Sequence, residues 1–218
     1  MSEEDVQTTL AAYAAIAAVY AGEEAGEDDP RLRARMRELF RERLPGPRVL
    51  ELGCGPGTDA AALAADGLEV TASDGCPAFL EVVRRRYPSL PTLELDLRGP
   101  LPAGPWDGIY GFACFVHLPR AAAAAALAAY RAALRPGGVL FLGLIRSERV
   151  AEYWIDGFGG DPAARVLFSC WAPAAFQALL QGAGFREVEV FTESAPIYET
   201  MPRLVERGVT LFQVRALA

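Results

Sequence analysis

Lysine is absent from the 218-residue chain, so all 21 residues counted as lysine or arginine are arginines. Schiff-base and pyridoxal-phosphate mechanisms require a lysine amine, and the phosphate loop of nucleotide hydrolases requires a Gly-Lys-Ser/Thr sequence. The absence of lysine therefore excludes both classes of chemistry.

Potential metal ligands are also scarce. His117 is the single histidine and the four cysteines show no C-x-x-C spacing, so the usual ligands of a structural zinc site are missing and no metal is expected. Acidic residues exceed basic ones by 28 to 21, which gives a net charge of −7. A chain with this balance has no broad basic face, so we expect no nucleic acid as a partner.

Long hydrophobic runs are missing as well. No apolar run reaches the roughly 18 to 20 residues that span a bilayer, and the first residues are acidic where a signal peptide would be basic. We therefore expect a cytoplasmic protein with reduced cysteines and no membrane contact. The chain is nevertheless 52% hydrophobic, which is enough to build one domain around a real core.

Two helices are predicted within residues 1–45. Apolar residues recur at steps of three and four from Leu10 to Tyr20, and again from Leu32 to Leu44. An acidic connector that contains glycine separates them at residues 22–30. We interpret residues 1–45 as a helical lid segment and residues 46–218 as the main domain.

Beyond the lid segment, short buried strands alternate with helices, which predicts an α/β fold with a parallel sheet covered on both faces. The segment from Arg146 to Trp171 fits neither period and is predicted to be a long loop, and such loops are often functional. Strands are expected at residues 48–52, 68–73, 92–95, 108–112, 139–145, 186–192 and 210–216, and helices at 58–65, 77–87, 121–134 and 173–181.

The strongest local signal is the segment Glu51-Leu52-Gly53-Cys54-Gly55-Pro56-Gly57-Thr58, which follows a predicted strand and opens a predicted helix. A glycine loop in this context allows a nucleotide-type ligand to approach the backbone closely. The dinucleotide fingerprint G-x-G-x-x-G is incomplete, because Thr58 stands where its last glycine belongs.

Acidic residues close the next two predicted strands. Asp74 lies 21 residues after Gly53, where a carboxylate can accept hydrogen bonds from two ribose hydroxyls, and Asp96 follows at the end of the third strand. Either acid alone is as well explained by a turn or a helix cap. The carboxyl ends of parallel strands meet at one edge of a sheet, however, so the ordered set predicts a ligand site.

These motifs together resemble those of class I S-adenosylmethionine-dependent methyltransferases, and the resemblance extends over almost the whole chain. The glycine loop is similar to the first motif of the family, and Leu95-Asp96-Leu97 is similar to its adenine-binding turn. Further resemblances are Trp106-Asp107-Gly108-Ile109-Tyr110 to the fourth strand, Leu134-Arg135-Pro136-Gly137-Gly138 to the turn before the fifth, and Gly182-Ala183-Gly184-Phe185 to the turn before the sixth.

The resemblance implies a Rossmann-like, doubly wound sheet of seven strands in the order 3-2-1-4-5-7-6, with strand seven antiparallel. It implies S-adenosyl-L-methionine (SAM) as the cofactor, with Asp74 at its ribose and Asp96 at its adenine. A sulfonium cofactor without phosphate suits an acidic, lysine-free site. The expected cofactor-binding residues are Tyr20, Glu51, Gly53, Cys54, Gly55, Thr58, Asp74, Gly75, Asp96, Leu97 and Phe112.

The end of the fourth strand resembles the family segment beside the reactive methyl group. His117 lies there and is a candidate general base, because its ordinary pKa near 6.5 allows it to accept a proton at neutral pH; lining of the pocket is the alternative. The Asn/Asp-Pro-Pro-Tyr/Phe motif is absent, which argues against DNA adenine and protein glutamine as acceptors. The expected substrate-side residues are Tyr13, His117, Arg146, Tyr153 and Trp154.

Two segments are expected to close the pocket. Tyr13 and Tyr20 share one face of the first helix in a pattern that resembles the lid helix of small-molecule methyltransferases, and core packing is the alternative for both. In the long loop, Tyr153, Trp154 and Phe158 would form an apolar wall, and Arg146 or Arg149 would pair with an acidic acceptor group. Pinning of a surface loop by aromatic residues explains that segment equally well.

The favoured function is methyl transfer from SAM to an oxygen, nitrogen or sulfur atom of a small soluble acceptor, by a monomer or homodimer. Two alternatives remain open. The first is a nicotinamide-dependent oxidoreductase, which Thr58 disfavours, and the second is a non-catalytic member that binds the cofactor and acts through a protein partner.

Overall fold

Parallel strands form the centre of the sheet in the computed structural model, which describes residues 3–20, 30–192 and 210–218. Five of them lie in the order β3-β2-β1-β4-β5, and short hydrophobic runs buried on both faces explain why these segments form central strands. Their bounds are β1 (Arg48–Glu51), β2 (Glu69–Asp74), β3 (Thr92–Glu94), β4 (Trp106–Phe112) and β5 (Leu134–Arg146).

Beyond β5 the sheet continues with two strands that pair in the antiparallel sense. β9 (Thr210–Leu217) pairs with β5, and β8 (Arg186–Phe191) pairs with β9. β8 and β9 correspond to the sixth and seventh predicted strands. The order of the seven predicted strands is therefore the expected 3-2-1-4-5-7-6, with the seventh strand antiparallel. The predicted fold class is therefore confirmed.

The predicted strand count is wrong, because the sheet has nine strands within the described residues. The segment from Arg146 to Trp171, expected to be a long loop, contains β6 (Glu152–Asp156), the 3-10 turn η2 (Phe158–Gly160) and β7 (Arg165–Trp171). β7 pairs with the end of β5 and with β6. β6 and β7 form an antiparallel hairpin with no α-helix between them, so they depart from the strand–helix alternation by which the central strands were predicted.

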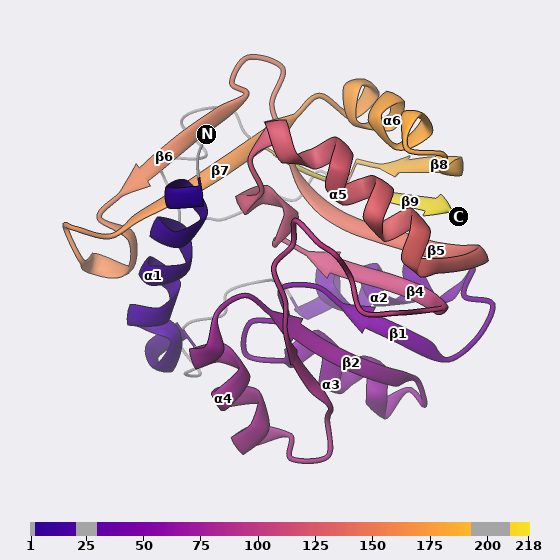
Figure 1. Cartoon of the computed structure of the whole chain (residues 1–218), viewed down its shortest axis with the longest axis horizontal. Coiled ribbons are helices and arrows are strands. Elements are labelled where there is room, and N and C mark those ends of the chain that lie inside the picture. The colour runs from indigo at the N-terminus through magenta and orange to yellow at the C-terminus, as the bar shows by residue number, and fades with distance from the viewer. Residues whose placement is uncertain (1–2, 21–29, 193–209) are drawn as a thin grey trace.

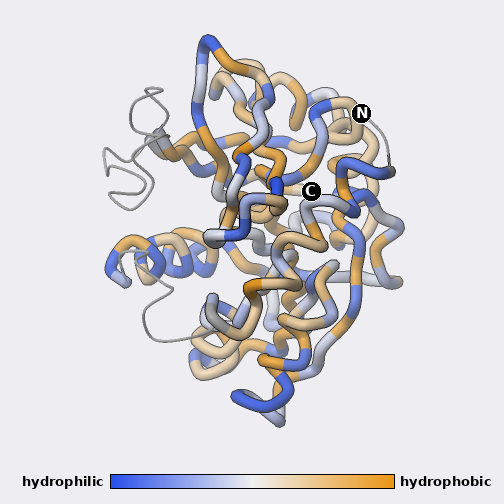
Figure 2. The backbone as a smooth tube through the Cα atoms, turned by 90° about the vertical axis from the view of Figure 1, so that its left-hand side faces the viewer, coloured by the Kyte–Doolittle hydropathy of each residue, from blue (hydrophilic) through white to orange (hydrophobic). Residues whose placement is uncertain are grey.

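Helices cover both faces of the sheet. α2 (Pro30–Arg41), α3 (Thr58–Ala65) and α4 (Pro77–Arg86) pack on one hydrophobic layer, and α5 (Arg120–Ala133) and α6 (Pro173–Gly182) pack on the other (Figure 1). Hydropathy changes within single turns of the surface helices, as expected for helices with one buried face (Figure 2). The sheet is thus the middle of three layers.

α1 (Glu3–Tyr20) does not cover a face of the sheet. It lies between β7 and α4, beside the carboxyl ends of the parallel strands (Figure 1). Residues 21–29, which include most of the expected connector, lie outside the described residues. Within the described part of the chain, no helix is both long and apolar enough to cross a membrane.

Candidate functional site

One pocket opens at the carboxyl ends of β1 to β4, with α1 along its side. Its volume is about 1060 Å³ when counted out to its mouth. Twelve residues named from the sequence line it, namely Tyr13, Tyr20, Glu51, Gly53, Cys54, Gly55, Asp74, Gly75, Asp96, Leu97, Phe112 and His117.

The floor of the pocket is the loop between β1 and α3. Gly53, Gly55 and Gly57 all have positive φ angles, of 58°, 51° and 83°. A Cβ on Gly53 would lie 2.2 Å from the Cβ of Cys114, whereas a Cβ on Gly55 would meet nothing within 4 Å. Gly53 therefore permits close packing against the end of β4, and Gly55 leaves its backbone open to a ligand.

Asp74 anchors this loop from the end of β2. Its two carboxylate oxygens accept hydrogen bonds from the backbone N–H of Gly55 at 2.9 Å and of Cys76 at 2.8 Å. Burial raises the pKa of Asp74 to about 6, although these backbone N–H groups act in the opposite direction. Each oxygen keeps acceptor capacity for a ligand hydroxyl.

Glu51 supplies the second buried acid. Its side chain is 3% exposed, and its Oε2 atom has no hydrogen-bond partner among the described residues. Burial, reinforced by the nearby Asp59 carboxylate, raises the pKa of Glu51 well above its ordinary value. A buried carboxylate oxygen without a partner is costly, and a bound cation or N–H donor would remove that cost.

Two charged residues that line the pocket, Asp59 and Arg33, were not predicted as site residues. Asp59 is buried at the start of α3 and accepts hydrogen bonds from Arg33 at 2.6 Å and from Arg37. The Arg33 guanidinium also lies 4.9 Å from the centre of the Phe112 ring. The spacing of Arg33 and Arg37 on one helical face was visible in the sequence, but their partner in another helix was not.

The third acid, Asp96, follows β3. Its carboxylate is held by the Arg98 backbone N–H at 2.8 Å and by the Arg98 guanidinium. Leu97 lines the same part of the pocket, and its carbonyl accepts a hydrogen bond from the Tyr130 hydroxyl. We call the part of the pocket around Glu51, Asp74 and Asp96 its acidic end.

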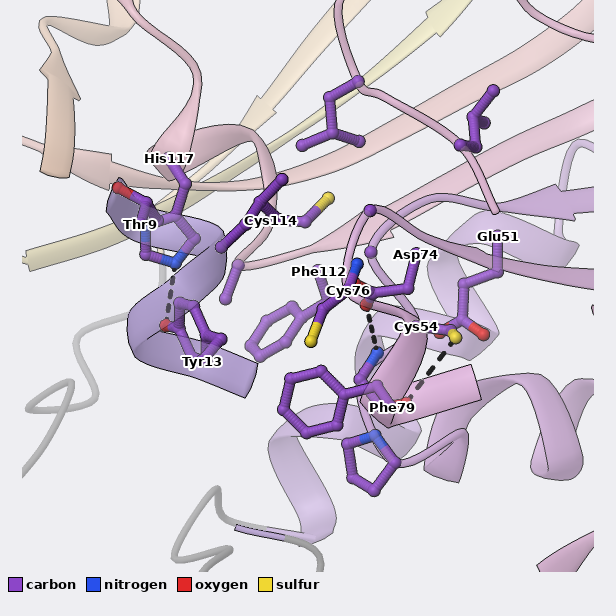
Figure 3. Close-up of a pocket in the computed structure, with 18 of the residues that line it drawn as sticks. Thr9, Tyr13, Glu51, Cys54, Asp74, Cys76, Phe79, Phe112, Cys114 and His117 are labelled. Carbon is purple, nitrogen blue, oxygen red and sulfur yellow. Dashed lines mark hydrogen bonds between the residues drawn. The ribbon is translucent and has the colours of Figure 1, made fainter. Parts of the chain in front are cut away.

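The opposite part of the pocket is built from rings, and we call the part around Tyr13 and His117 its aromatic end. The two side chains meet there, with Tyr13 Oη 2.9 Å from His117 Nε2, while Glu51 and Asp74 lie at the other side of the close-up (Figure 3). Phe158 packs 5.0 Å from the Tyr13 ring and Phe168 packs 4.8 Å from the His117 ring, measured between ring centres. Burial lowers the pKa of His117 to about 4.

Four of the residues named from the sequence are not among those that line the pocket. Thr58 is exposed at the start of α3. Arg146 lies 3.6 Å from Glu148 at the end of β5, and Trp154 is covered by the Arg165 guanidinium at 4.8 Å. Tyr153 stacks on Phe168, whose ring packs against His117, so Tyr153 supports the aromatic end from outside the lining.

Cys54, Cys76 and Cys114 also line the pocket, and all three are buried. Burial raises the pKa of each thiol, which keeps it protonated and unreactive at neutral pH. Among residues 3–20, 30–192 and 210–218, no group of histidine, cysteine and acidic residues has the arrangement of a metal site.

Comparison with known proteins decides the family. Residues 49–138 match the model of a methyltransferase domain. Trans-aconitate 2-methyltransferase of Methylobacterium radiotolerans is 33% identical over 178 residues, which cover 75% of this chain and 67% of that protein. This chain belongs to the class I S-adenosylmethionine-dependent methyltransferases.

Other relatives agree with this assignment of the methyltransferase. A ubiquinone biosynthesis O-methyltransferase of Xylella fastidiosa is 33% identical over 132 residues, which cover 57% of this chain and 52% of that enzyme. The structure of DhpI in complex with S-adenosylhomocysteine (SAH) matches with a TM-score of 0.78 at 22% identity, over 99% of this chain and 98% of that one.

The predictions of an enzyme and of SAM as its cofactor are therefore confirmed, and the comparisons give no support to a nicotinamide-dependent oxidoreductase.

Proposed function

We propose that the methyltransferase transfers the SAM methyl group to an oxygen, nitrogen or sulfur atom of a small soluble acceptor within the pocket described above. The observation that supports this most strongly is the orphaned Glu51 Oε2, buried in a pocket that Asp74 and Asp96 also line. SAM has an ammonium and a sulfonium group and no phosphate, so it matches an acidic pocket.

The residues at the acidic end fit the parts of this cofactor. Asp74 would accept hydrogen bonds from the ribose hydroxyls, and Asp96 with Leu97 would contact the adenine. Glu51 Oε2 would accept a hydrogen bond from the ammonium group of the cofactor. The Arg33 guanidinium lines the same pocket and would balance the charge of the cofactor carboxylate. Gly55 leaves room for this contact because its Cβ position is open.

When bound, SAM supplies a methyl group on a sulfonium, which is an excellent leaving group. The contribution of the chain is then alignment and exclusion of water. Phe112 at the end of β4 lies between Glu51 and Tyr13 in the close-up (Figure 3), so a bound acceptor would face the methyl group from the side of Tyr13 and His117. Well-oriented reactants can recover roughly 7 to 11 kcal/mol of a bimolecular barrier.

His117 is better placed to hold Tyr13 than to deprotonate the acceptor itself. Both of its ring nitrogens lie within hydrogen-bond distance of protein groups, Tyr13 Oη at 2.9 Å and the Leu167 carbonyl at 2.8 Å. We therefore propose that His117 acts at the acceptor through Tyr13.

We propose further that residues 1–45, set against a methyltransferase domain of residues 46–218, have two roles: α1 lies along the pocket as the lid, whereas α2 packs on the sheet. The chain would work in the cytoplasm as a monomer or homodimer, without nucleic acid. The trans-aconitate and ubiquinone-pathway names of the relatives agree with a small acceptor.

The test combines binding with turnover. Calorimetric titration with SAH should show one site per chain, and a screen of small hydroxyl, amine and thiol acceptors with methyl-labelled SAM should yield labelled product. Cofactor binding without transfer to any acceptor would support a non-catalytic role, and absence of SAH binding would remove the proposal altogether.

The variant Glu51→Gln sharpens this test. The amide should weaken SAH roughly tenfold, because a charge-assisted hydrogen bond to the ammonium is lost. The same substitution should leave the free protein equally or more stable to heat, because it removes a carboxylate that is buried without a partner. A merely structural role for Glu51 predicts the opposite pattern, with lower stability and unchanged affinity per folded molecule.

A further inference from the structure

Tyr13, His117 and the Leu167 carbonyl form a continuous chain of hydrogen bonds at the aromatic end, and a separate hydrogen bond ties Leu167 to Thr9. The His117 Nδ1 atom lies 2.8 Å from the backbone carbonyl oxygen of Leu167, and His117 Nε2 lies 2.9 Å from Tyr13 Oη. The Leu167 backbone N–H in turn donates to Thr9 Oγ1 at 3.2 Å. The chain therefore joins β7, the turn after β4 and α1.

The chemistry of these groups fixes the direction of the chain. A carbonyl oxygen can only accept, so the hydrogen bond to Leu167 requires a proton on His117 Nδ1. Burial keeps the imidazole neutral by lowering its pKa to about 4, so Nε2 then carries a lone pair. The Tyr13 hydroxyl must consequently donate its proton to Nε2.

This direction restricts what Tyr13 can offer to a ligand. Because its proton is committed to His117, Tyr13 Oη meets any further partner only as a hydrogen-bond acceptor. Tyr13 lines the pocket, and its ring lies 6.0 Å from that of Tyr20, 6.1 Å from that of Phe79 and 5.0 Å from that of Phe158. A partner of this oxygen is thus held among aromatic rings.

The charges around the pocket act in the same direction. Glu51, Asp74 and Asp96 all line it, and the one cationic side chain among its described lining residues, Arg33, is hydrogen-bonded to Asp59 at 2.6 Å. These acids lie at the other end of the pocket from Tyr13, so an anionic group beside Tyr13 would gain no balancing cation there and would face an oxygen lone pair, which is unfavourable.

We propose that the methyl acceptor presents a hydrogen-bond donor to Tyr13 Oη, which makes it an uncharged hydroxyl or N–H compound with a flat, apolar body. A carboxylate group is excluded from this position, so the acceptor differs in charge from the trans-aconitate in the name of the Methylobacterium radiotolerans relative. The inference rests on the proposed function and deepens it, because it names the class of acceptor that the pocket takes.

The direction of the hydrogen bonds from Tyr13 through His117 to Leu167 can be measured without knowing the acceptor. His117 is the single histidine of the sequence, so a ¹⁵N spectrum of the labelled protein with SAH contains one imidazole. We expect a neutral ring at pH 7 with the proton on Nδ1 and an unprotonated Nε2. A proton on Nε2, or a doubly protonated ring, would overturn the proposal, because Tyr13 would then direct its own proton to the pocket.

The second arm uses phenol and benzoate as matched flat probes on the SAH complex. Phenol should bind roughly tenfold or more tightly than benzoate, since only phenol can donate to Tyr13 Oη. The variant Tyr13→Phe should lose most of this preference. Phenol that binds no better than benzoate to the unmodified protein would overturn the proposal.

A variant of His117 distinguishes a positioning role of this residue from a purely structural one. In His117→Leu the Tyr13 proton is released to the pocket, so the ratio of phenol to benzoate binding should shift towards benzoate by roughly tenfold. Loss of structure alone would weaken both probes equally. Tyr87→Phe removes a tyrosine hydroxyl outside the pocket lining and should leave the ratio unchanged.

Failure here and failure of the proposed function are distinguishable. If SAH does not bind, the proposed function fails. If SAH binds and the histidine tautomer or the probe ratio differs from expectation, the function stands and only the acceptor class is wrong. Should His117→Leu fail to fold, the tautomer of the unmodified protein still decides.

Discussion

The acidic and aromatic ends of the pocket are assembled from the sequence in different ways. Glu51, Asp74 and Asp96 lie at the ends of three neighbouring strands within a stretch of 46 residues. Backbone N–H groups nearby hold the carboxylates of Asp74 and Asp96 in place. Tyr13 and His117 are 104 residues apart, and they meet only because α1 lies along β7. On the function proposed above, cofactor recognition is locally encoded, whereas acceptor recognition depends on tertiary packing.

The largest expected effect is at the acidic end. Asp74→Ala removes the acceptor of two ribose hydrogen bonds and leaves two backbone N–H groups without a carboxylate, so SAH affinity should fall roughly 100-fold or more. Calorimetric titration measures this change. Asp66→Ala removes an exposed acid paired with Arg41 at 2.9 Å and should leave the affinity unchanged.

If the two aspartate variants weaken SAH equally, the locally encoded site at the end of β2 is not where the cofactor binds.

The next effect concerns the fold of the glycine loop. Gly53→Ala should lower the free energy of unfolding by about 2 to 4 kcal/mol, because its Cβ meets Cys114 and the residue has a positive φ. Gly67→Ala shares the positive φ but meets nothing within 4 Å, so it should cost only about 1 kcal/mol. Denaturant unfolding of both variants measures the difference, and equal losses would contradict the packing role assigned to Gly53.

A smaller effect should appear as a pH dependence of cofactor affinity. The pKa of Asp74 in the free protein is about 6, above its ordinary value of 3.8, whereas the ribose hydroxyls favour the ionised form. Protonation of Asp74 therefore competes with the cofactor, and SAH affinity should fall by up to roughly tenfold per pH unit below pH 6. Titrations between pH 5 and 8 measure this slope.

The variant Asp74→Asn should abolish this pH slope, because the amide does not titrate in this range. A slope that persists in the variant would assign the proton to another group, of which Glu51 is the nearest buried candidate.

The smallest effect is expected at the hairpin of β6 and β7. Trp154→Ala removes a side chain that contacts Arg165 away from the pocket lining, so SAH affinity should change by less than about twofold. A large loss of affinity would show that the hairpin reaches the cofactor, and the division into two ends would then be incorrect.

The same contrast explains what the sequence could predict. The meeting of Glu51, Asp74 and Asp96 at one edge follows from local motifs, since parallel strands place their ends together, whereas the strand order was implied by the family resemblance. β6 and β7 were missed because they form a hairpin with no α-helix between them, which departs from the strand–helix alternation of the central strands. The pairing of Arg33 with Asp59 joins α2 to α3 and has no local signature.

The most direct measurement is a crystal structure of the protein with SAH. We expect adenine at Asp96 and Leu97, ribose at Asp74 and the amino group at Glu51 Oε2, with the sulfur directed past Phe112 towards an open space in front of Tyr13. SAH bound elsewhere, or extended across the aromatic end so that no space remains beside Tyr13 and His117, would contradict this account.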